Sequence, residues 1–323
     1  MAASLTRRTL IPALAAMPFA APVQAAQDEA PIRVDVNLVN VPFAVYDANG
    51  RLIPDLSASD FDVFEDGQPQ KIRFFSRATE SPLTIAVVAD ISGSQKEYLK
   101  EHRKHLRDFL KTALKPRDMA TLIAFGANVW EVSRPDTRPD QLDDALAEFQ
   151  KAKNVSERYR RLSPQEIRDN TSSFYDGVVE AAKALREATG RRAVLLFSDG
   201  EDNSSARNLL DAIEASQEHS VTVFSLRYTD LKKGGVWSAR NKYGRSVMQR
   251  LSAETGGLEF DAAREDDLKA AFRQISELLR NSYDLAYASS QSERDSTFRK
   301  IRIKPKDPKL RVRHKTGYFA RPL

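Results

Sequence analysis

The sequence predicts an α/β protein: a doubly wound, mostly parallel sheet inserted into a small β-sandwich that strands from both chain ends form together. Between residues 81 and 282, short apolar runs alternate with longer helical patterns, which is typical of strands buried on both faces. Residues 26–80 and 283–323 instead alternate apolar and polar side chains with period two. Neither flank alone has enough strands to bury the apolar face of a sheet, so we expect the strands of both flanks to pair with each other. The alternative is that the terminal strands extend or cap the central sheet separately.

The N-terminal segment 1–25 has the pattern of an export signal. Arg7 and Arg8 precede an apolar stretch, and Val23 and Ala25 fit the small-residue positions that a signal peptidase requires. The paired arginines resemble a twin-arginine signal, although a plain Sec signal also holds two arginines. This stretch is shorter than the ~20 residues that span a bilayer, and no later segment reaches that length. We therefore expect an exported protein, periplasmic or secreted, without a transmembrane segment.

Charge and composition exclude several functional classes. The 323 residues include 50 Lys and Arg against 45 Asp and Glu, and this net charge of +5 is too small and too evenly spread to indicate a nucleic-acid partner. The absence of cysteine removes disulfides, thiolate metal sites and cysteine nucleophiles together. Four scattered histidines argue against a histidine-rich zinc site.

The N-terminal flank is predicted to hold a strand followed by a hairpin. The alternation of Val34, Val36 and Leu38 continues at Val41 with its phase slipped, which indicates a bulge near Val39. The hairpin is predicted from two apolar runs, residues 61–64 and 72–75, with Glu65-Asp66-Gly67 as the turn signal.

The central segment and the C-terminal flank follow the two patterns already described. Buried strands are predicted at residues 85–89, 120–125, 193–197 and 221–226, and a short strand at 258–260. Helices are predicted around residues 99–114, 142–149, 174–185, 251 and 268–279. Further strands are predicted at residues 285–287, 298–303 and 310–312. Nine basic residues between Arg299 and Lys315 interleave with apolar ones. We interpret them as outward-facing side chains that protect a sheet edge, in preference to a patch that binds a membrane or nucleic acid.

Oxygen-bearing side chains follow two of the buried strands. The first strand ends in Asp90-Ile91-Ser92-Gly93-Ser94, and the third ends in Ser198-Asp199-Gly200. A hydroxyl-rich segment, residues 170–173, precedes a helix. Because the carboxyl ends of parallel strands meet at one edge, these loops are expected to offer ligands to one point. Carboxylates and hydroxyls suit Mg²⁺, Mn²⁺ or Ca²⁺ and not Zn²⁺.

These motifs resemble the metal-ion-dependent adhesion site of von Willebrand factor type A (VWA) domains, a Rossmann-like fold. The flanking sequences are similar to the bacterial VWFA-related family first catalogued from acidobacteria. They are the segment from Phe61 to Gly67, the segment Thr255-Gly256-Gly257 and the ending Gly317-Tyr318-Phe319-Ala320. The similarity covers almost all of the chain that follows the export signal, in the same order.

The resemblance implies a role for each site residue. Ser92 and Ser94 would bind the cation directly, while Asp90 and Asp199 would act through water or hydrogen-bond the hydroxyls. The family's threonine position maps to Ser172, where serine keeps the hydroxyl. Its neighbour Thr171 and the carboxylate of Asp202 are further candidates to bind the cation or its ligands. Gln95 stands where many relatives have methionine, but this position does not supply a ligand to the cation.

The sequence therefore predicts a non-enzymatic module that binds a protein partner. A divalent cation would coordinate the carboxylate of an exposed Asp or Glu of that partner, in cell adhesion or envelope assembly. Mg²⁺ is the expected ion, in preference to Mn²⁺ or Ca²⁺. Arg158, Arg160 and Arg161 would steer such an acidic partner. The alternative is an accessory or chaperone-like protein of an enzyme complex with a structural cation. A hydrolase using Asp90 and Asp199 lacks a candidate base.

Overall fold

A computed structural model describes residues 38–92, 95–163, 171–228, 239–291, 293 and 295–320. The predicted export signal lies outside the described residues, and so does Ser94. No helix in the described ranges is both long and apolar enough to cross a bilayer.

A seven-stranded sheet forms the centre of the α/β part, in the order β11-β10-β9-β5-β6-β7-β8. The strands are β5 Leu83–Asp90, β6 Met119–Phe125, β7 Val129–Glu131, β8 Arg160–Arg161, β9 Arg191–Ser198, β10 Val221–Arg227 and β11 Glu259–Asp261. The five strands from β11 to β6 run parallel, and β7 and β8 add an antiparallel edge. Every residue of β5 is buried, because helices cover both faces of the sheet.

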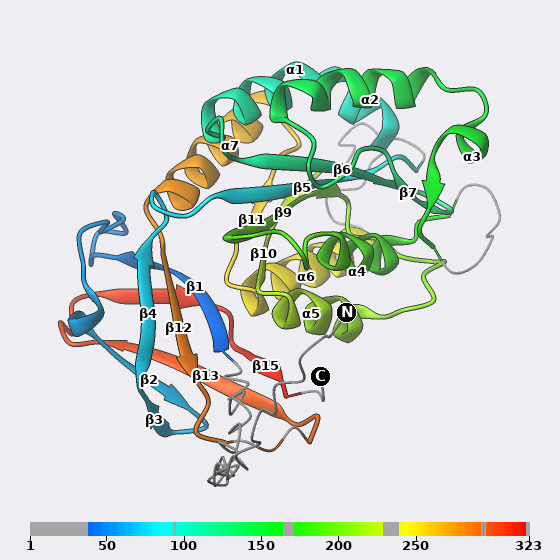
Figure 1. Cartoon of the computed structure of the whole chain (residues 1–323). Coiled ribbons are helices and arrows are strands. Elements are labelled where there is room, and N and C mark those ends of the chain that lie inside the picture. The colour runs from blue at the N-terminus through cyan, green and yellow to red at the C-terminus, as the bar shows by residue number, and fades with distance from the viewer. Residues whose placement is uncertain are drawn as a thin grey trace, which may run out of the picture. The chain divides into compact units, whose positions relative to one another are not determined.

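Helices cover the two faces in two groups (Figure 1). One face packs against α1 Gln95–Ala113, α2 Leu142–Lys151 and α7 Glu265–Arg280. The other packs against α4 Phe174–Ala184, α5 Leu209–Glu218 and α6 Ala239–Glu254. Short helical turns lie at α3 Val155–Arg158, η1 Ala58–Asp60 and η2 Pro139–Gln141. The predicted doubly wound architecture is confirmed.

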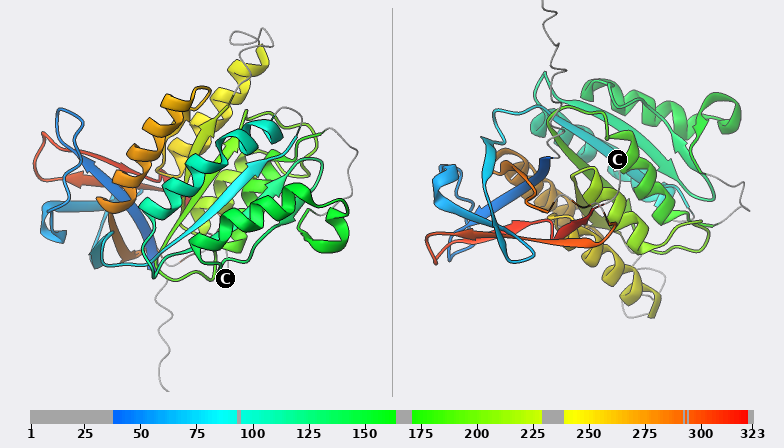
Figure 2. Two further views of the ribbon diagram at one scale, coloured as in Figure 1. Left: turned by 90° about the horizontal axis from the view of Figure 1, so that it is seen from above. Right: turned by 60° about the horizontal axis from the view of Figure 1, so that its bottom comes forward.

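Strands from both chain ends form two further sheets, which pack as a sandwich. One has the order β14-β1-β12-β4, from β1 Leu38–Tyr46, β4 Ile72–Arg77, β12 Tyr283–Ala288 and β14 Arg311–His314. The other has the order β15-β13-β2-β3, from β2 Phe61–Glu65, β3 Gln68–Gln70, β13 Phe298–Pro305 and β15 Gly317–Phe319. Their shared core holds Phe43 against Phe61 and Tyr283, at ring-centroid distances of 5.1 and 5.2 Å. Figure 2 shows these blue and red strands side by side, which confirms the sandwich.

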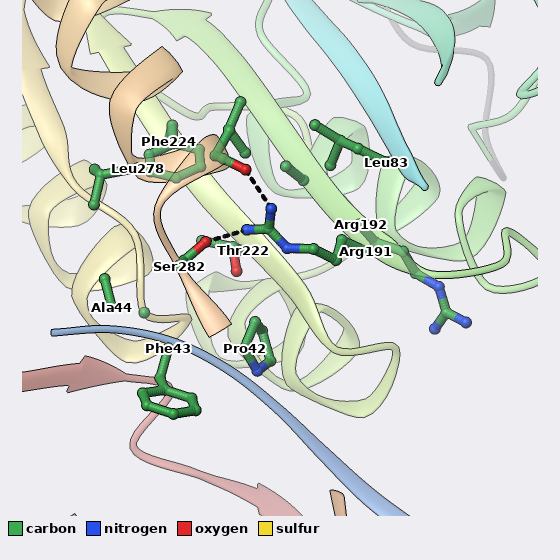
Figure 3. Close-up of a pocket in the computed structure, with 13 residues that line it drawn as sticks. Pro42, Phe43, Ala44, Leu83, Arg191, Arg192, Thr222, Phe224, Leu278 and Ser282 are labelled. Atoms are coloured by element: carbon green, nitrogen blue, oxygen red, sulfur yellow. Dashed lines mark hydrogen bonds between the residues drawn. The ribbon is translucent and has the colours of Figure 1, made fainter. Parts of the chain in front are cut away.

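The sandwich contacts the amino ends of the central strands. Arg191, the first residue of β9, donates hydrogen bonds to Leu279 O and, at 2.5 Å, to Ser282 Oγ, where α7 leads into β12. These groups line a cavity of about 30 Å³ between the two parts, room for about one water molecule (Figure 3). Ser220 Oγ adds a hydrogen bond to Asn40 O at 3.2 Å. The metal-binding edge predicted from the sequence is therefore the opposite end of the sheet.

Three local predictions are wrong. The pairing of β1 with β12 runs from Leu38 to Phe43 without a register shift, so the bulge near Val39 does not exist. In the hairpin, β2 pairs with β3 through a tight turn at Asp66 and Gly67, whose φ angles of 47° and 84° fit a type I′ turn. The apolar run of β4 pairs instead with β12 in the other sheet.

The third error concerns the basic residues of the C-terminal flank. Arg299 is buried, because it shares the inward face of β13 with Ile301 and Ile303. Its guanidinium donates to Glu293 O at 3.0 Å. Lys315 is buried too, and its ammonium donates to Gln217 O at 3.0 Å. Lys300, Arg302 and Lys304 do face outward, as predicted.

Candidate metal centre

Asp90 is the most constrained side chain at the carboxyl edge of the central sheet. It is the last residue of β5 and only 1% exposed. One carboxylate oxygen accepts hydrogen bonds from Ser92 N at 2.9 Å and Ser92 Oγ at 2.5 Å, and the other accepts one from Ser198 Oγ at 2.9 Å. Both hydroxyls thus direct their protons toward Asp90. The lone pairs of the Ser92 oxygen stay available to a cation.

The carboxylates at this edge are held in an environment that disfavours negative charge. Burial, and after it the nearby charge of Asp199, raise the pKa of Asp90 to about 7, against the hydrogen bonds from the two serines. Asp199 follows β9 and accepts a hydrogen bond from Glu201 N at 3.0 Å. A cation placed between the two carboxylates would offset both unfavourable effects.

The hydroxyl-rich segment 171–173 meets the Asp90 loop at the end of β6. Gly126 follows β6, and a Cβ atom on it would lie 3.9 Å from both Ser92 N and Thr171 O. Ser173 N donates to Gly126 O at 2.8 Å, and Ser173 Oγ donates to Ala127 O at 3.0 Å. The two loops therefore converge over the same strand end.

The loop after β9 holds Ser172 from the other side. Ser172 N donates to Asn203 Oδ1 at 2.7 Å, and Ser172 O accepts hydrogen bonds from Asn203 N and Ser204 N at 3.1 and 3.2 Å. The backbone of Ser172 is thus fixed by the loop that begins at Asp199. Hydrogen bonds and close contacts thus join three segments far apart in the sequence at this edge.

The Ser172 hydroxyl is a buried polar group without a hydrogen-bond partner in the described part of the chain. The residue is 6% exposed, and a buried hydroxyl left unpaired costs about 1–3 kcal/mol. A cation would supply the missing partner, because a hydroxyl oxygen is a hard ligand that Mg²⁺, Mn²⁺ and Ca²⁺ accept. The residues present fit a divalent cation on this observation.

The remaining candidates take different positions. Asp202 accepts hydrogen bonds from Ser205 Oγ at 2.5 Å and from Tyr175 N at 3.4 Å, so it is engaged at the first turn of α4. Burial raises its pKa. Thr171 lies in the converging segment, while Ser94 lies outside the described residues. In the ranges described, no three acidic or histidine side chains gather as a metal site, so the candidate centre depends on hydroxyls.

Arg158 ends α3, and Arg160 and Arg161 form β8. β8 is the edge strand, three strands from β5, which corresponds to about 14 Å at ~4.8 Å per strand. Arg160 Nη1 lies 3.5 Å from Glu131 Oε2, and Arg158 Nη2 lies 4.0 Å from Glu148 Oε2. These are exposed ion pairs of low energy. Any influence of this group on the site is a long-range electrostatic one.

Sequence reasoning missed two supports of the site. Asn203 fixes Ser172, and its place in the polar run after the third strand was the available signal. Gly244 on α6 contacts the loop after β9, because a Cβ atom there would lie 2.2 Å from Asp199 O. Its neighbour Tyr243 is exposed, and the Tyr243 hydroxyl lies 3.4 Å from that of Tyr175. Such a close approach has no local sequence pattern.

The comparison with protein families agrees with this geometry. The family described as VWA domain containing CoxE-like protein matches residues 62–255, about three fifths of the chain. The matched range contains all the segments that converge at the candidate centre. None of the curated proteins matches this sequence.

Several solved structures are similar over part of the chain. Proximal thread matrix protein 1 from the mussel byssus is 14% identical with a TM-score of 0.41, over 61% of this chain and 48% of that one. BatB from Bacteroides thetaiotaomicron is 17% identical with a TM-score of 0.42, over 61% and 98%. The PilB minor pilin from Streptococcus sanguinis is 12% identical with a TM-score of 0.43, over 62% of each chain. This chain thus spans about half the length of the mussel protein.

Proposed function

The chain belongs to the family of VWA domain containing CoxE-like proteins, and we propose that it is an exported, non-enzymatic module that binds a protein partner through a divalent cation. Ser92, Ser94 and Ser172 would hold the cation by their hydroxyls. Asp90 and Asp199 would orient these ligands and balance part of the charge. Mg²⁺ is the proposed ion before Mn²⁺ or Ca²⁺.

The buried, unpartnered hydroxyl of Ser172 carries the proposal. Within the described residues this hydroxyl has no hydrogen-bond partner, whereas its neighbour Ser173 has two, Ala127 O and Ser204 Oγ. The hydrogen bond of Ser92 Oγ to Asp90 gives the same indication, since the hydroxyl proton points to the carboxylate and the oxygen lone pairs stay available to a cation. Both observations are expected of a site arranged around a cation.

Neutral ligands explain why such a site would bind and not catalyse. Hydroxyls leave most of the cation's charge uncompensated, so a carboxylate of a partner's Asp or Glu gains a strong charge-assisted bond at an open coordination position. Three histidines of the described residues lie elsewhere: His105 pairs with Glu265, His219 follows α5 as its C-cap, and His314 is the last residue of β14. None of these three is placed as a general base at the carboxyl edge.

The cation site is tested first by titration with metal alone. We expect Mg²⁺ to bind the purified protein in isothermal titration calorimetry, and we expect Asp90→Asn and Ser172→Ala each to weaken binding at least tenfold. Ser216→Ala is the matched control, since this hydroxyl is buried on α5 and donates to Ala212 O at 2.8 Å. Failure of the wild type to bind Mg²⁺, Mn²⁺ and Ca²⁺ would overturn the proposal.

The partner chemistry is tested with matched peptides that carry either Asp or Asn at one exposed position. We expect the immobilised protein to retain Asp peptides in Mg²⁺, and to lose them in EDTA or when Asn replaces Asp. Metal binding without this carboxylate preference would instead indicate a structural cation, as in an accessory protein of an enzyme complex. Turnover of phosphoester or peptide substrates would contradict the non-enzymatic assignment.

A further inference from the structure

A row of cationic side chains lies on the outer face of the sheet β15-β13-β2-β3. Lys300, Arg302 and Lys304 are exposed on β13, while the residues between them face the core. Alternate residues of a strand are about 6.8 Å apart, so the row extends about 14 Å along the strand. Because β13 is an inner strand of this sheet, the row lies within the face and not at its edge.

The neighbours of the row compensate only part of its charge. Lys304 lies opposite Asp62, and the backbone N of Lys300 donates to Asp66 Oδ1 at 2.8 Å, so two carboxylates lie near the ends of the row. No side chain of the three cations forms an ion pair with a described carboxylate, and Arg302 has an aromatic residue opposite it. A stable fold does not require this concentration of charge, since like charges on one face repel each other.

Apolar side chains accompany the cations on the same face. Phe64 lines a hollow of about 360 Å³ together with Gly67, Lys300, Arg302 and Lys304. At the other end of the row Phe298 is 40% exposed, and its ring lies 5.2 Å from that of Phe319. Aromatic rings beside Lys and Arg suit the boundary between phospholipid headgroups and acyl chains.

From this arrangement we propose that the outer face of the sheet β15-β13-β2-β3 binds the surface of a bilayer that contains anionic phospholipids. The three cations would contact lipid phosphates, and the exposed ring of Phe298 would enter the headgroup region. Three such cations and a net charge of +5 are too few for the many phosphate contacts of nucleic-acid binding. An exposed aromatic ring beside the row favours lipid over an acidic protein.

This attachment leaves the candidate metal centre accessible. The sandwich contacts the amino ends of the central strands through Arg191 and Ser220, whereas Asp90 and Asp199 follow the carboxyl ends. A chain bound by its sandwich would therefore keep the metal-binding edge free for a protein partner. The lipid-binding face does not depend on the cation, so the two proposals can fail independently.

The test is cosedimentation of the purified full chain with vesicles, in EDTA to exclude bridging by metal. We expect binding at 50 mM NaCl to vesicles of phosphatidylglycerol and phosphatidylcholine, mixed at about 3:7, and at least tenfold weaker binding at 300 mM NaCl. Lys300→Glu/Arg302→Glu/Lys304→Glu should weaken binding at least tenfold. The matched control is Lys111→Glu/Lys115→Glu/Arg250→Glu, which changes the net charge equally at exposed positions outside this face.

Each other outcome overturns the lipid proposal. It fails if wild type does not sediment with the anionic vesicles, if it binds pure phosphatidylcholine equally well, or if both triple variants lose binding alike. Tighter binding to duplex DNA or polyglutamate than to the vesicles, at the same salt, would assign the face to those polyanions. Phe298→Ser, with an unchanged circular dichroism spectrum, should reduce the binding that persists at 300 mM NaCl.

Discussion

Single hydroxyls separate function from stability at the candidate metal centre. Ser172 and Ser173 are adjacent buried serines, yet only the Ser173 hydroxyl is hydrogen-bonded within the described part of the chain. A buried hydroxyl without a partner reduces stability, whereas a paired one contributes about 1 kcal/mol. The two positions therefore respond to the same substitution in different ways.

We expect Ser172→Ala to leave the free energy of unfolding in EDTA unchanged or to raise it by up to about 1 kcal/mol, because it removes an unpaired polar group. Ser173→Ala should lower it by about 1–2 kcal/mol, because Ala127 O and Ser204 Oγ lose their partner. Urea denaturation of both variants measures this contrast. A larger loss for Ser172→Ala would show that its hydroxyl has a structural partner.

Lys315 gives the molecule a second residue-scale property, a dependence of stability on pH. Burial, and after it the charge of Arg192, lower its pKa to about 7. Its Nζ donates to Gln217 O and Ser220 Oγ, where β14 and the strand after it meet α5. The folded state thus binds fewer protons than the unfolded state between about pH 7 and the ordinary lysine pKa of 10.5.

Stability should consequently rise with pH in this window, since the unfolded state holds the extra proton. Below pH 7 both states are protonated and the penalty is fully present. We expect the free energy of unfolding to increase between pH 7 and pH 9 by about 2 kcal/mol more in the wild type than in Lys315→Met. Equal pH profiles for the two proteins would show that Lys315 keeps an ordinary pKa.

At the scale of elements, periodicity predicted the buried strands but not their partners. The apolar run from Ile72 to Phe75 is the same whether it pairs with β2 or with β12, because the choice depends on contacts with the distant C-terminal flank. The helix α5 was missed although Asn208 caps it, accepting hydrogen bonds from Leu210 N and Asp211 N. That cap was its available signal.

The two arginines of β8, at the antiparallel edge of the central sheet, are expected to affect how fast an acidic partner associates. β8 places Arg160 and Arg161 beside β7, too far from Asp90 for contact but within range of long-range electrostatics at low salt. We expect Arg160→Glu/Arg161→Glu to slow association with an Asp peptide in Mg²⁺ about three- to tenfold at 50 mM NaCl, and to change dissociation little.

Stopped-flow association at 50 and 300 mM NaCl checks this effect. The difference between wild type and variant should shrink at high salt, because screening removes long-range attraction. Lys151→Glu/Lys153→Glu, at exposed positions at the end of α2 and just after it, is a control for net charge. An unchanged association rate in Arg160→Glu/Arg161→Glu would contradict a steering role for these arginines.

At the scale of the whole molecule, a core-size argument predicted that the two chain ends pair. Tyr283 illustrates the result, since its hydroxyl donates to Ile53 O at 2.6 Å and accepts from Leu56 N at 3.0 Å, which joins the two flanks of the chain. The buried face of Arg299 was implicit in the same alternation, because it lies two residues before Ile301. Arg299 was predicted to face outward because of its charge alone, and the neighbouring sequence does not show which groups its guanidinium contacts.

The junction between the sandwich and the α/β part rests on a charge pair between Arg191 and Asp284. Arg191 Nε lies 3.2 Å from Asp284 Oδ2, close enough for an ion pair although not aligned as a hydrogen bond. Burial lowers the pKa of Arg191 and raises that of Asp284, and their mutual attraction opposes both shifts. Each charge therefore tolerates burial mainly because of the other.

We expect Arg191→Met to lower the free energy of unfolding by about 3 kcal/mol or more, because it strands Asp284 and also removes the hydrogen bonds to Leu279 O and Ser282 Oγ. Asp284→Leu should cost less, since those hydrogen bonds remain. The double variant should be more stable than the sum of the two losses predicts, which urea denaturation of all four proteins measures. Strict additivity would mean that the charges of Arg191 and Asp284 do not interact, and that the other contacts, among them the hydrogen bond from Ser220 Oγ to Asn40 O, join the two parts of the molecule.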